Sequence, residues 1–550
     1  MTSPPRSELP REQHPALAAW TDLSQPPASA ARQATLLSRH WARALVGSFT
    51  LPWLMAAIAF VIVFCAPGFT DPDFYWHLKT GELIAQTGAI PTTDPFSFTY
   101  AGKPWVTHEW LTEVLFYWTA SAGGFGALRL LPALAAAVNF MLLYAIARRL
   151  AGKELLAALA TACFFIPLMP SFTLRPQIFT FLCFTTYLLV LVDFKYFRST
   201  RLLWLLPVLM LAWVNLHGAF MLGIALLAAF MVCEWGNRWL FPVRHSRSSQ
   251  RLGLLAAVLA ATVAATLVNP QGLRLLLYPF ETVAMEASKG LIAEWHSPDF
   301  HELLPRVSLA GIFAWFIATA YAGRKPDLTE ILLPLLLIVA GLSAWRHLPL
   351  MAIVLLTFFC AMLRHVRPSE ILARAFWRRR RASASDGKQV TRTQAGLVHL
   401  FVLGGVVLAA LAGAVKTERE GETSKFVASG AASFLLAQDV HGRLLNDYDL
   451  GGYLIWRLWP LHKVFIDGRA DLYGDDFLKA YFRVDKAAEG WEKTIDGYAI
   501  DIVVFSRNAP LRQLLLASGK FREAYADAYH AVLLRDVPRF KPLLDQPERR

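Results

Sequence analysis

Charged residues are scarce in this chain. Of its 550 residues, 17% are charged and 55% are hydrophobic, and the mean hydropathy is +0.39. In soluble proteins about a quarter of all residues are charged. This composition therefore argues against a soluble enzyme and predicts a multi-span membrane protein. The net charge of +13 does not indicate nucleic-acid binding, because the basic residues cluster in short segments between apolar runs.

Cysteine is also scarce, and the hydrophilic C-terminal part has none. The five cysteines all fall inside apolar runs, at Cys65, Cys163, Cys183, Cys233 and Cys360. No disulfide framework and no metal-thiolate site is therefore expected. A cleavable signal pattern is lacking too, since about forty polar, proline-containing residues precede the first apolar run. We expect residues 1–42 to form a disordered cytoplasmic leader.

Long apolar runs dominate residues 43–415, and we expect this part to form an α-helical polytopic membrane bundle. At about 20 residues per span, eleven spans are predicted, at 46–66, 125–147, 154–172, 177–193, 202–216, 218–236, 252–268, 306–322, 328–345, 347–364 and 396–415.

The distribution of Lys and Arg predicts how the bundle is oriented. One set of alternate loops carries 21 of these residues, at 148–153, 193–201, 237–251, 323–327 and 364–392. The other set carries 7, at 67–110, 171–176, 215–218, 269–306 and 345–347. Basic loops remain in the cytoplasm, so the N-terminus is predicted inside and the C-terminal part outside.

Motifs that mix uncommon polar residues with aromatic or turn residues all fall in the poorly basic, outer loops. They are DPDFYWH (71–77), THEW (107–110), TLRPQ (173–177), NLHG (215–218), NPQGLR (269–274), EWHSPDF (294–300) and AWRHLP (344–349). Polar residues that converge on one face of a membrane bundle indicate a functional site there.

The stretch Asp71 to Trp110, in the first outer loop 67–110, is the richest of these. Asp71 and Pro72 are typical of a helix start, and Gly88 is typical of its end, which predicts an amphipathic helix along the membrane surface. Thr107 is placed to cap the next helix. A D-x-D spacing alone is weak evidence for catalysis, and Asp71 could simply cap its helix.

From about residue 416 the composition changes, and residues 416–550 predict a small extracytoplasmic α/β domain. Strands are expected at 442–447, 463–468 and 501–506, in a mostly parallel sheet. The expected helices are 475–484 and 510–518. The blocks NDYDLGGYLIW and DGRADLYG combine acids with glycine near strand ends, where such sheets hold sites, although ordinary turn chemistry explains them equally well.

The motif Asp71-Pro72-Asp73-Phe74-Tyr75-Trp76 resembles a block of the GT-C fold, the fold of membrane glycosyltransferases that use lipid-linked sugars. In the branch of protein mannosyltransferases and aminoarabinose transferases, the loop after the first span often begins Asp-Glu-x-x-Tyr-Trp. Here Pro72 replaces the Glu, so Asp73 would be the acidic partner. The chain also resembles a set of bacterial multi-pass membrane proteins that share DPDFYWHL, NPQG and IDGRADLYG.

The resemblance implies transfer from a polyprenyl-phosphate sugar, which needs a carboxylate base and groups that stabilise the departing phosphate. Asp71 is the candidate base, with Asp73 the alternative base; either would serve as a ligand if a divalent metal takes part. His108 and Glu109 would complete the pocket, and His217 is either a site residue or a packing residue. Further candidate substrate-binding residues are His77, Lys103, Trp295 and, for the phosphate, Arg175, Arg274 and Arg346.

These features predict an inverting glycosyltransferase of the bacterial inner membrane with its site on the outer, periplasmic face. Its partners would be a polyprenyl-phosphate sugar, the bilayer and a glycan, lipid or protein acceptor, with no nucleic acid. Two alternatives are an O-antigen ligase or polymerase, which would place its chemistry in the late loop 269–306, and a transporter or flippase of lipid-linked saccharides.

Overall fold

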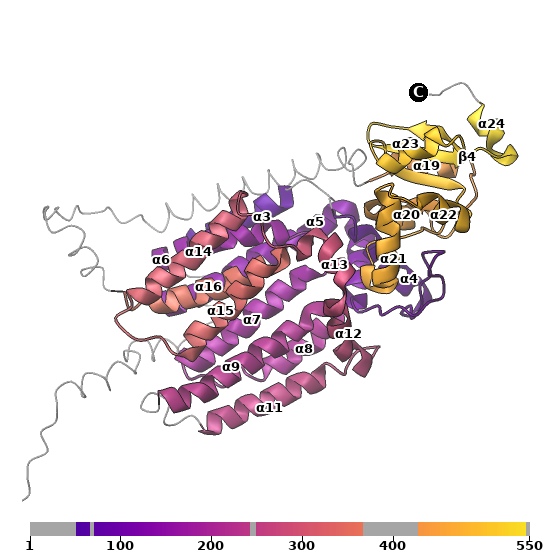
Figure 1. Cartoon of the computed structure of the whole chain (residues 1–550). Helices are drawn as coiled ribbons and strands as arrows, with labels where there is room; N and C mark the ends of the chain where they lie inside the picture. The colour runs from indigo at the N-terminus through magenta and orange to yellow at the C-terminus, as the bar shows by residue number, and fades with distance from the viewer. Residues whose placement is uncertain (1–50, 66–70, 242–248, 367–426, 546–550) are drawn as a thin grey trace, which may run out of the picture.

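A bundle of apolar helices carries a small α/β domain at one end (Figure 1). The computed structural model describes residues 51–65, 71–241, 249–366 and 427–545. The expected leader 1–42 and the eleventh expected span, 396–415, lie outside the described residues. Residues 427–545 are called the C-terminal domain below.

Ten apolar helices occupy the first ten expected spans. Six elements are long and apolar enough to cross a membrane: Trp110–Ala151, Glu154–Ser171, Gln177–Tyr196, Gly218–Leu240, Leu303–Ala320 and Trp345–Leu363. They correspond to α5 (Trp110–Ala151), α6 (Glu154–Phe165) with η2 (Ile166–Ser171), α7 (Gln177–Tyr196), η3 (Gly218–Phe220) with α9 (Met221–Leu240), α14 (Leu303–Ala320), and η5 (Trp345–His347) with α16 (Leu348–Leu363). The shorter apolar helices are α3 (Leu51–Cys65), α8 (Leu205–Leu216), α11 (Ser249–Ala265) and α15 (Leu328–Ser343). The count of eleven spans stays a prediction.

Helix α5 begins before its expected span because it has two parts. Gly123 and Gly124 break the helical backbone, and the part before them packs against α4. Its start also corrects a prediction: Glu109 stands at the N-cap, and no side chain caps the helix. The Thr107 hydroxyl instead donates to the Pro91 carbonyl at 2.6 Å, within the first outer loop.

The predicted amphipathic helix is α4 (Phe74–Thr87). It begins two residues later than expected, after Asp73, and Asp71 accepts a hydrogen bond from the Asp73 backbone N–H at 3.0 Å. Gly88 ends it as predicted, with φ of 67° and its N–H donated to Ile84. One face of α4 is buried against α5 and α20.

The polar motifs do converge at one end of the bundle. There α4 lies with α12 (Leu273–Ala284) and α13 (Glu286–Leu291) beside the C-terminal domain (Figure 1). The short helices η4 (Ala293–Trp295) and η5 are packed together at the same end. We call this the domain end of the bundle.

The C-terminal domain contains one four-stranded sheet in the order β1-β2-β4-β3. Only β1 and β2 are parallel, while β2–β4 and β3–β4 are antiparallel, so the prediction of a mostly parallel sheet is wrong. The strands are β1 (Leu444–Asn446), β2 (Ile502–Ser506), β3 (Phe521–Ala526) and β4 (His530–Arg535). Its helices are α19 (Ser429–Ala437), η6 (Tyr448–Leu450), α20 (Gly451–Leu458), α21 (Ala470–Asp485), α22 (Trp491–Gly497), α23 (Pro510–Ala517), η7 (Pro538–Phe540) and α24 (Lys541–Leu544).

The expected strand 463–468 is also wrong, for a physical reason. Its apolar residues are buried, but the segment does not join the sheet. Val464 forms a single parallel bridge with Ser97 of the first outer loop. Its backbone groups instead bond on one side to the first outer loop and on the other side to the Asn446 side chain of β1.

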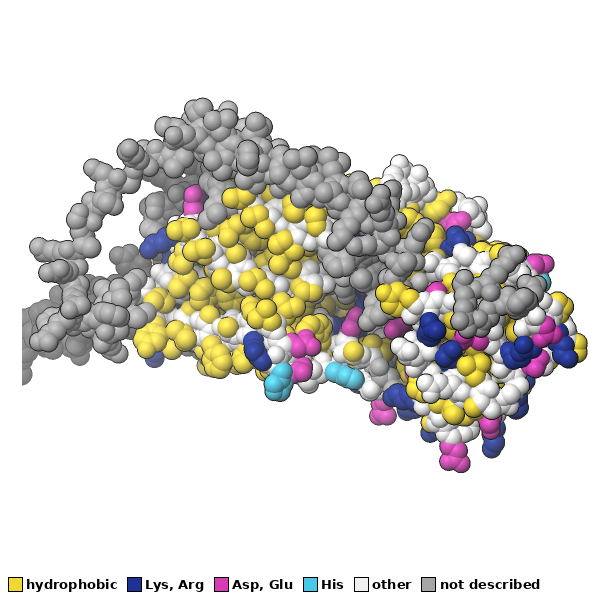
Figure 2. Space-filling model, turned by 90° about the horizontal axis from the view of Figure 1, so that it is seen from above, with side chains coloured by type: hydrophobic (Ala, Val, Ile, Leu, Met, Phe, Trp, Pro, Cys, Tyr) yellow, Lys and Arg dark blue, Asp and Glu magenta, His cyan; other side chains and the backbone are white. Residues whose placement is uncertain are grey.

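The surface agrees with a membrane bundle carrying a water-exposed domain. Figure 2 shows hydrophobic side chains over the bundle and charged side chains distributed over the C-terminal domain. Large exposed apolar residues on the bundle include Trp235, Trp239, Phe313 and Val339. Such a surface is stable against lipid and unfavourable in water.

We predict that the domain end faces the outside of the cell. In a variant without native cysteines, a cysteine at Ala101 or Ser518, both exposed at the domain end, should react with a membrane-impermeant maleimide in intact spheroplasts. A cysteine at exposed Lys153, in a basic loop, should react only after permeabilisation and serves as the control. Protection of both Ala101→Cys and Ser518→Cys in intact spheroplasts would reverse the orientation.

Candidate functional site

Arg175 organises the polar residues at the domain end. Its guanidinium forms ion pairs with Asp71, with Asp73 at 2.9 Å and with Glu294. The residue lies between η2 and α7, directly before Pro176 at the start of α7. Because the guanidinium is a planar fork of N–H donors, one residue orients three carboxylates from segments far apart in the sequence.

Asp71 and Asp73 form a buried carboxylate pair on this cation. Asp73 also accepts a hydrogen bond from the Trp76 indole N–H at 3.3 Å. Burial raises the pKa of Asp71, and it raises the pKa of Asp73 to about 7 even though Arg175 acts in the opposite direction. A carboxylate with such a pKa can take up and release a proton near neutral pH, as general acid–base catalysis requires.

A second cluster surrounds Glu109. Three histidines turn Nε2 towards its carboxylate, at 3.6 Å for His77, 3.3 Å for His217 and 3.7 Å for His108. His77 also contacts Glu113 through Nδ1 at 3.2 Å. Burial raises the pKa of Glu109 and lowers the pKa of His77 and His217 well below the usual value, so both imidazoles are neutral near pH 7.

The tautomer of His217 follows from its neighbours. The Trp213 indole N–H donates to the Thr180 hydroxyl at 2.8 Å, and that hydroxyl lies 2.7 Å from Nδ1 of His217. The backbone N–H of Ala219 also points at Nδ1, at 3.4 Å. Nδ1 therefore accepts, and the ring proton is on Nε2, facing Glu109. The structure thus places His217 in the Glu109 cluster, with its N–H directed at that carboxylate.

Arg346 and Trp295 lie beside the Arg175 cluster. The guanidinium of Arg346 stacks 4.4 Å from the centroid of the Trp295 ring. Glu294, the residue before Trp295, is paired with Arg175, so the two arginines flank one short helix, η4. Among the described residues, Arg346 forms no ion pair, which leaves its charge available to an anionic ligand.

The C-terminal domain contacts both clusters through α21 and Gly468. Tyr278 of α12 donates a hydrogen bond to Asp471 of α21, and its ring packs 4.9 Å from the ring of His108. The approach is closest at Gly468, where an added Cβ would stand 1.6 Å from Oδ1 of Asp73.

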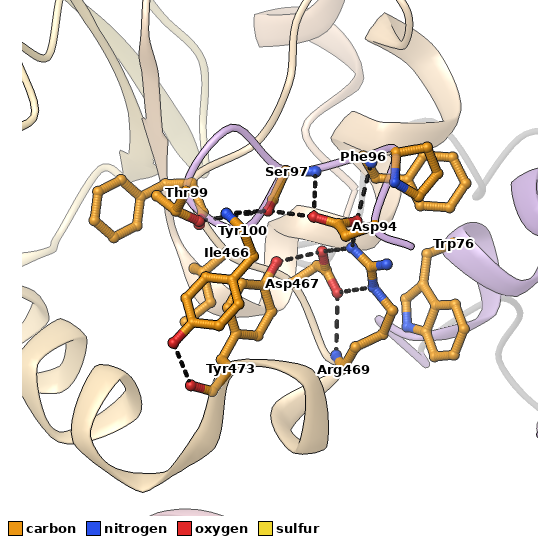
Figure 3. Close-up of polar contacts among 12 residues, drawn as sticks. Trp76, Asp94, Phe96, Ser97, Thr99, Tyr100, Ile466, Asp467, Arg469 and Tyr473 are labelled. Atoms are coloured by element: carbon orange, nitrogen blue, oxygen red, sulfur yellow. Dashed lines mark hydrogen bonds and ion pairs between the residues drawn. The ribbon is translucent and has the colours of Figure 1, made fainter. Parts of the chain in front are cut away.

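The two residues on either side of Gly468 in the sequence, Asp467 and Arg469, belong to a buried ion-pair network, which Figure 3 shows. Arg469 forms two 2.7 Å hydrogen bonds with Asp467 and pairs with Asp94 of the first outer loop at 2.8 Å. Tyr473 donates to Asp467 at 2.7 Å, and Ser97 donates to Asp94 at 2.5 Å. Every one of these side chains is nearly or fully buried, so this network joins the two parts of the protein without water between them.

Two predicted residues are not part of the site. Lys103 is exposed at the tip of a turn, and Arg274 is exposed on the outer side of α12, whereas Leu275 and Tyr278 of that helix face inward. Neither Lys103 nor Arg274 forms an ion pair within the described ranges. The distribution of basic residues placed both side chains in outer loops, but it could not show which way they point.

A metal role for Asp71 and Asp73 does not fit the observed arrangement. Arg175 already pairs with both carboxylates. In the part of the chain that the structure describes, no group of three or more His, Cys, Asp or Glu side chains has the arrangement of a metal site. These two carboxylates are therefore held by a guanidinium in place of a metal ion.

Sequence reasoning missed several residues that the structure places in the site. Glu294 belongs to the motif EWHSPDF, which had been singled out, but only its neighbour Trp295 was chosen. Glu113 follows Glu109 by four residues, a spacing that brings side chains together on a helix. Thr180 lies in an apolar span, and Gly468 carries no side chain, so neither gave a signal.

Comparisons with known proteins bear on the fold. No protein-family model matches the chain, and no curated protein matches its sequence. Among solved structures, the apo oligosaccharyltransferase of Archaeoglobus fulgidus matches with a TM-score of 0.50 at 13% identity, over 83% of this chain and 69% of that one. ArnT of Cupriavidus metallidurans bound to undecaprenyl phosphate gives a TM-score of 0.48 at 14% identity, over 87% of this chain and 96% of that one. The chain thus has the fold of a GT-C glycosyltransferase, as its first outer loop predicted.

Proposed function

We propose that this protein is an inverting membrane glycosyltransferase that moves a sugar from a polyprenyl-phosphate carrier to an acceptor at the domain end, on the outer face of the membrane. The observation that carries this proposal is the carboxylate pair of Asp71 and Asp73, held by Arg175 at one end of a GT-C bundle. Transfer of this kind needs a carboxylate base at the membrane surface and a cation for the departing phosphate.

Geometry favours Asp73 as the base, with Asp71 as its support. Asp71 is the more buried of the two side chains, at 10% exposed against 23%, and it accepts the Asp73 backbone N–H as well as pairing with Arg175. The Asp73 carboxylate, with its pKa of about 7, is the better proton acceptor at neutral pH. The sequence favoured Asp71, and the two assignments predict different effects of substitution.

Arg346 is the better partner for the phosphate. Arg175 is engaged by three carboxylates, which together outweigh its charge, so a phosphate would meet net negative charge there. Arg346 keeps its planar fork unpaired among the described residues, and Trp295 supports it from one face. A guanidinium in this state suits two phosphate oxygens at once.

The reaction then follows in one displacement. The acceptor hydroxyl attacks the anomeric carbon while Asp73 takes its proton, so a new C–O bond forms. The bond between that carbon and the phosphate oxygen breaks, and its electron pair leaves with the polyprenyl phosphate. Arg346 stabilises the charge that grows on the leaving oxygen.

The alternative of a transporter is less well supported. Besides the Arg175 cluster, the structure has a second buried network at Lys195, which pairs with Glu234 and, at 2.7 Å, with Asp327. Arg175 precedes α7 and Lys195 lies in its last turn, so the two networks are roughly 30 Å apart, one at each end of the helix. Clusters at the two faces fit an enzyme better than a carrier, whose ionisable residues line a mid-bundle path.

The ligase or polymerase alternative places its chemistry in loop 269–306. This loop does contribute to the site, through Tyr278, Glu294 and Trp295. In that reading, however, Asp71 and Asp73 are dispensable. The carboxylate variants below therefore separate the two functions.

We predict that Asp73→Asn abolishes transfer, with a loss of turnover of at least about 100-fold, the lower end of the usual range for losing a general base. Asp71→Asn, which keeps the oxygen that accepts the Asp73 N–H, should lose less. The measurement is transfer in vitro from a panel of polyprenyl-phosphate sugars, with and without chelator. If Asp71→Asn is the more damaging change, the base is Asp71; full activity of both variants would favour a ligase.

The pH dependence should report the same carboxylate. A base must be deprotonated to act, and Asp73 has a pKa of about 7. We therefore expect kcat/KM to fall about tenfold per pH unit below pH 7 and to level off above it. The measurement is kcat/KM from initial rates between pH 5 and 9. A profile that stays flat down to pH 5 would rule out Asp73 as the base.

Arg346→Lys tests the phosphate assignment. Lysine keeps the charge but loses the planar fork and the stacking on Trp295, so turnover should drop at least tenfold although net charge is unchanged. Arg274→Lys, on the exposed side of α12, is the matched control and should behave as wild type. Normal kinetics in Arg346→Lys would show that this residue only anchors the bundle at the lipid surface.

A further inference from the structure

Two glycines of the C-terminal domain mark its closest approach to the first outer loop. A Cβ added at Gly468 would stand 1.6 Å from Oδ1 of Asp73, and one added at Gly452 would stand 2.3 Å from the backbone oxygen of Pro72. Any larger residue must displace its neighbour at such distances. The domain backbone is therefore packed directly against the segment that carries the carboxylate pair.

The backbone at Gly468 is held in place from both sides. Asp467 accepts the Arg469 backbone N–H at 3.1 Å, and the Ala470 N–H donates to the Gly468 carbonyl at 2.9 Å. The Arg469 guanidinium, which pairs with Asp467 and Asp94, lies 4.6 Å from the centroid of the Trp105 ring. Ion pairs this deeply buried tolerate little displacement, because a separated charge would be left without water.

Further hydrogen bonds dock the same edge of the domain onto the first outer loop. Phe98 donates its backbone N–H to Val464 at 3.0 Å, and Val464 donates its own to Phe96 at 3.2 Å. The Thr99 hydroxyl donates to Phe465 at 2.6 Å. These contacts make the loop and residues 464–469 one rigid unit.

We propose that Gly468 is a positioning residue, and that the C-terminal domain acts through it to hold the Asp73 carboxylate in its working position. This inference rests on the proposed function for its kinetic consequence, but its structural content is independent of activity. Gly468 lies against Oδ1 of Asp73 while Arg175 pairs with Oδ2, so the domain backbone and the cation together restrict how the carboxylate can turn. It also assigns a role to the DGRADLYG block, which the catalytic chemistry alone leaves unused.

Gly468→Ala is the direct test. Gly468 does not have a left-handed φ, so its backbone accepts alanine, and the methyl group acts only through its contact with Asp73. We expect kcat to fall about 100-fold, the usual cost of misplacing a reacting group by about 1 Å, with KM for the polyprenyl-phosphate sugar within twofold of wild type. Gly497→Ala, at an open position in the same domain, is the matched control and should behave as wild type.

Amide hydrogen exchange on the same detergent-solubilised proteins gives a reading that needs no activity. In Gly468→Ala, exchange should become faster at the amides of Asp73 and His77, which are bonded to Asp71 and to the Asp73 carbonyl. Faster exchange there supports the inference even if no sugar donor is turned over by the wild type, a result that would overturn only the proposed function. Unchanged exchange at these amides overturns the inference whatever the activity.

Asp94→Asn provides a second variant in case the alanine methyl displaces the whole domain. It weakens the ion pair with Arg469 without touching Asp73, and undocking is reported by faster exchange at Phe98 and Val464. If those amides exchange faster and kcat falls with KM unchanged, the domain positions the carboxylate. If they exchange faster and kcat is retained, or if Gly497→Ala is as damaging as Gly468→Ala, the inference is wrong.

Discussion

One buried cation sets the geometry of the domain end. Arg175 gathers carboxylates from the first outer loop and from the late loop, and without it Asp71, Asp73 and Glu294 would repel each other. Removing such acids even partly from water is costly, and the shared guanidinium offsets this cost for all three. The raised pKa of Asp73 follows from the same arrangement, since one positive charge does not fully offset the loss of water. Chemistry and architecture at this end thus depend on the same side chain.

Sequence reasoning recovered what depends on local pattern. Apolar run length located ten helices of the bundle, and the cap chemistry of Gly88 gave the end of α4. The first-loop motif predicted the fold, and the convergence of polar motifs predicted that Asp71, Asp73 and Arg175 lie together. Each of these signals is carried by a few neighbouring residues whose physical preference does not depend on distant contacts.

What the sequence could not give depends on contacts between distant segments. Segment 463–468 has the composition of a strand, but its hydrogen bonds go to the Asn446 side chain and to the first outer loop, more than 350 positions away. Thr107 fits a helix cap, but tertiary structure assigns its hydroxyl to Pro91. Arg274 and Arg346 are both arginines in outer-loop motifs, so the sequence does not distinguish them. In the structure Arg274 faces outward from α12, whereas Arg346 stacks on Trp295. Gly468 is the hardest residue to predict, because it matters by leaving room for the Asp73 carboxylate where any side chain would overlap it.

Helix α7 is held at both ends by ion pairs, those of Arg175 directly before its start and those of Lys195 in its last turn. Many spanning helices adapt to a bilayer by tilting or sliding. Helix α7 cannot tilt or slide relative to the segments that hold its ends without separating these charge pairs. The distance between the two networks, roughly 30 Å along α7, is therefore fixed. In a thinner or thicker bilayer, α7 must therefore move as one unit with the segments that hold its two ends, so the bundle adapts by tilting as a whole and not by the sliding of this helix.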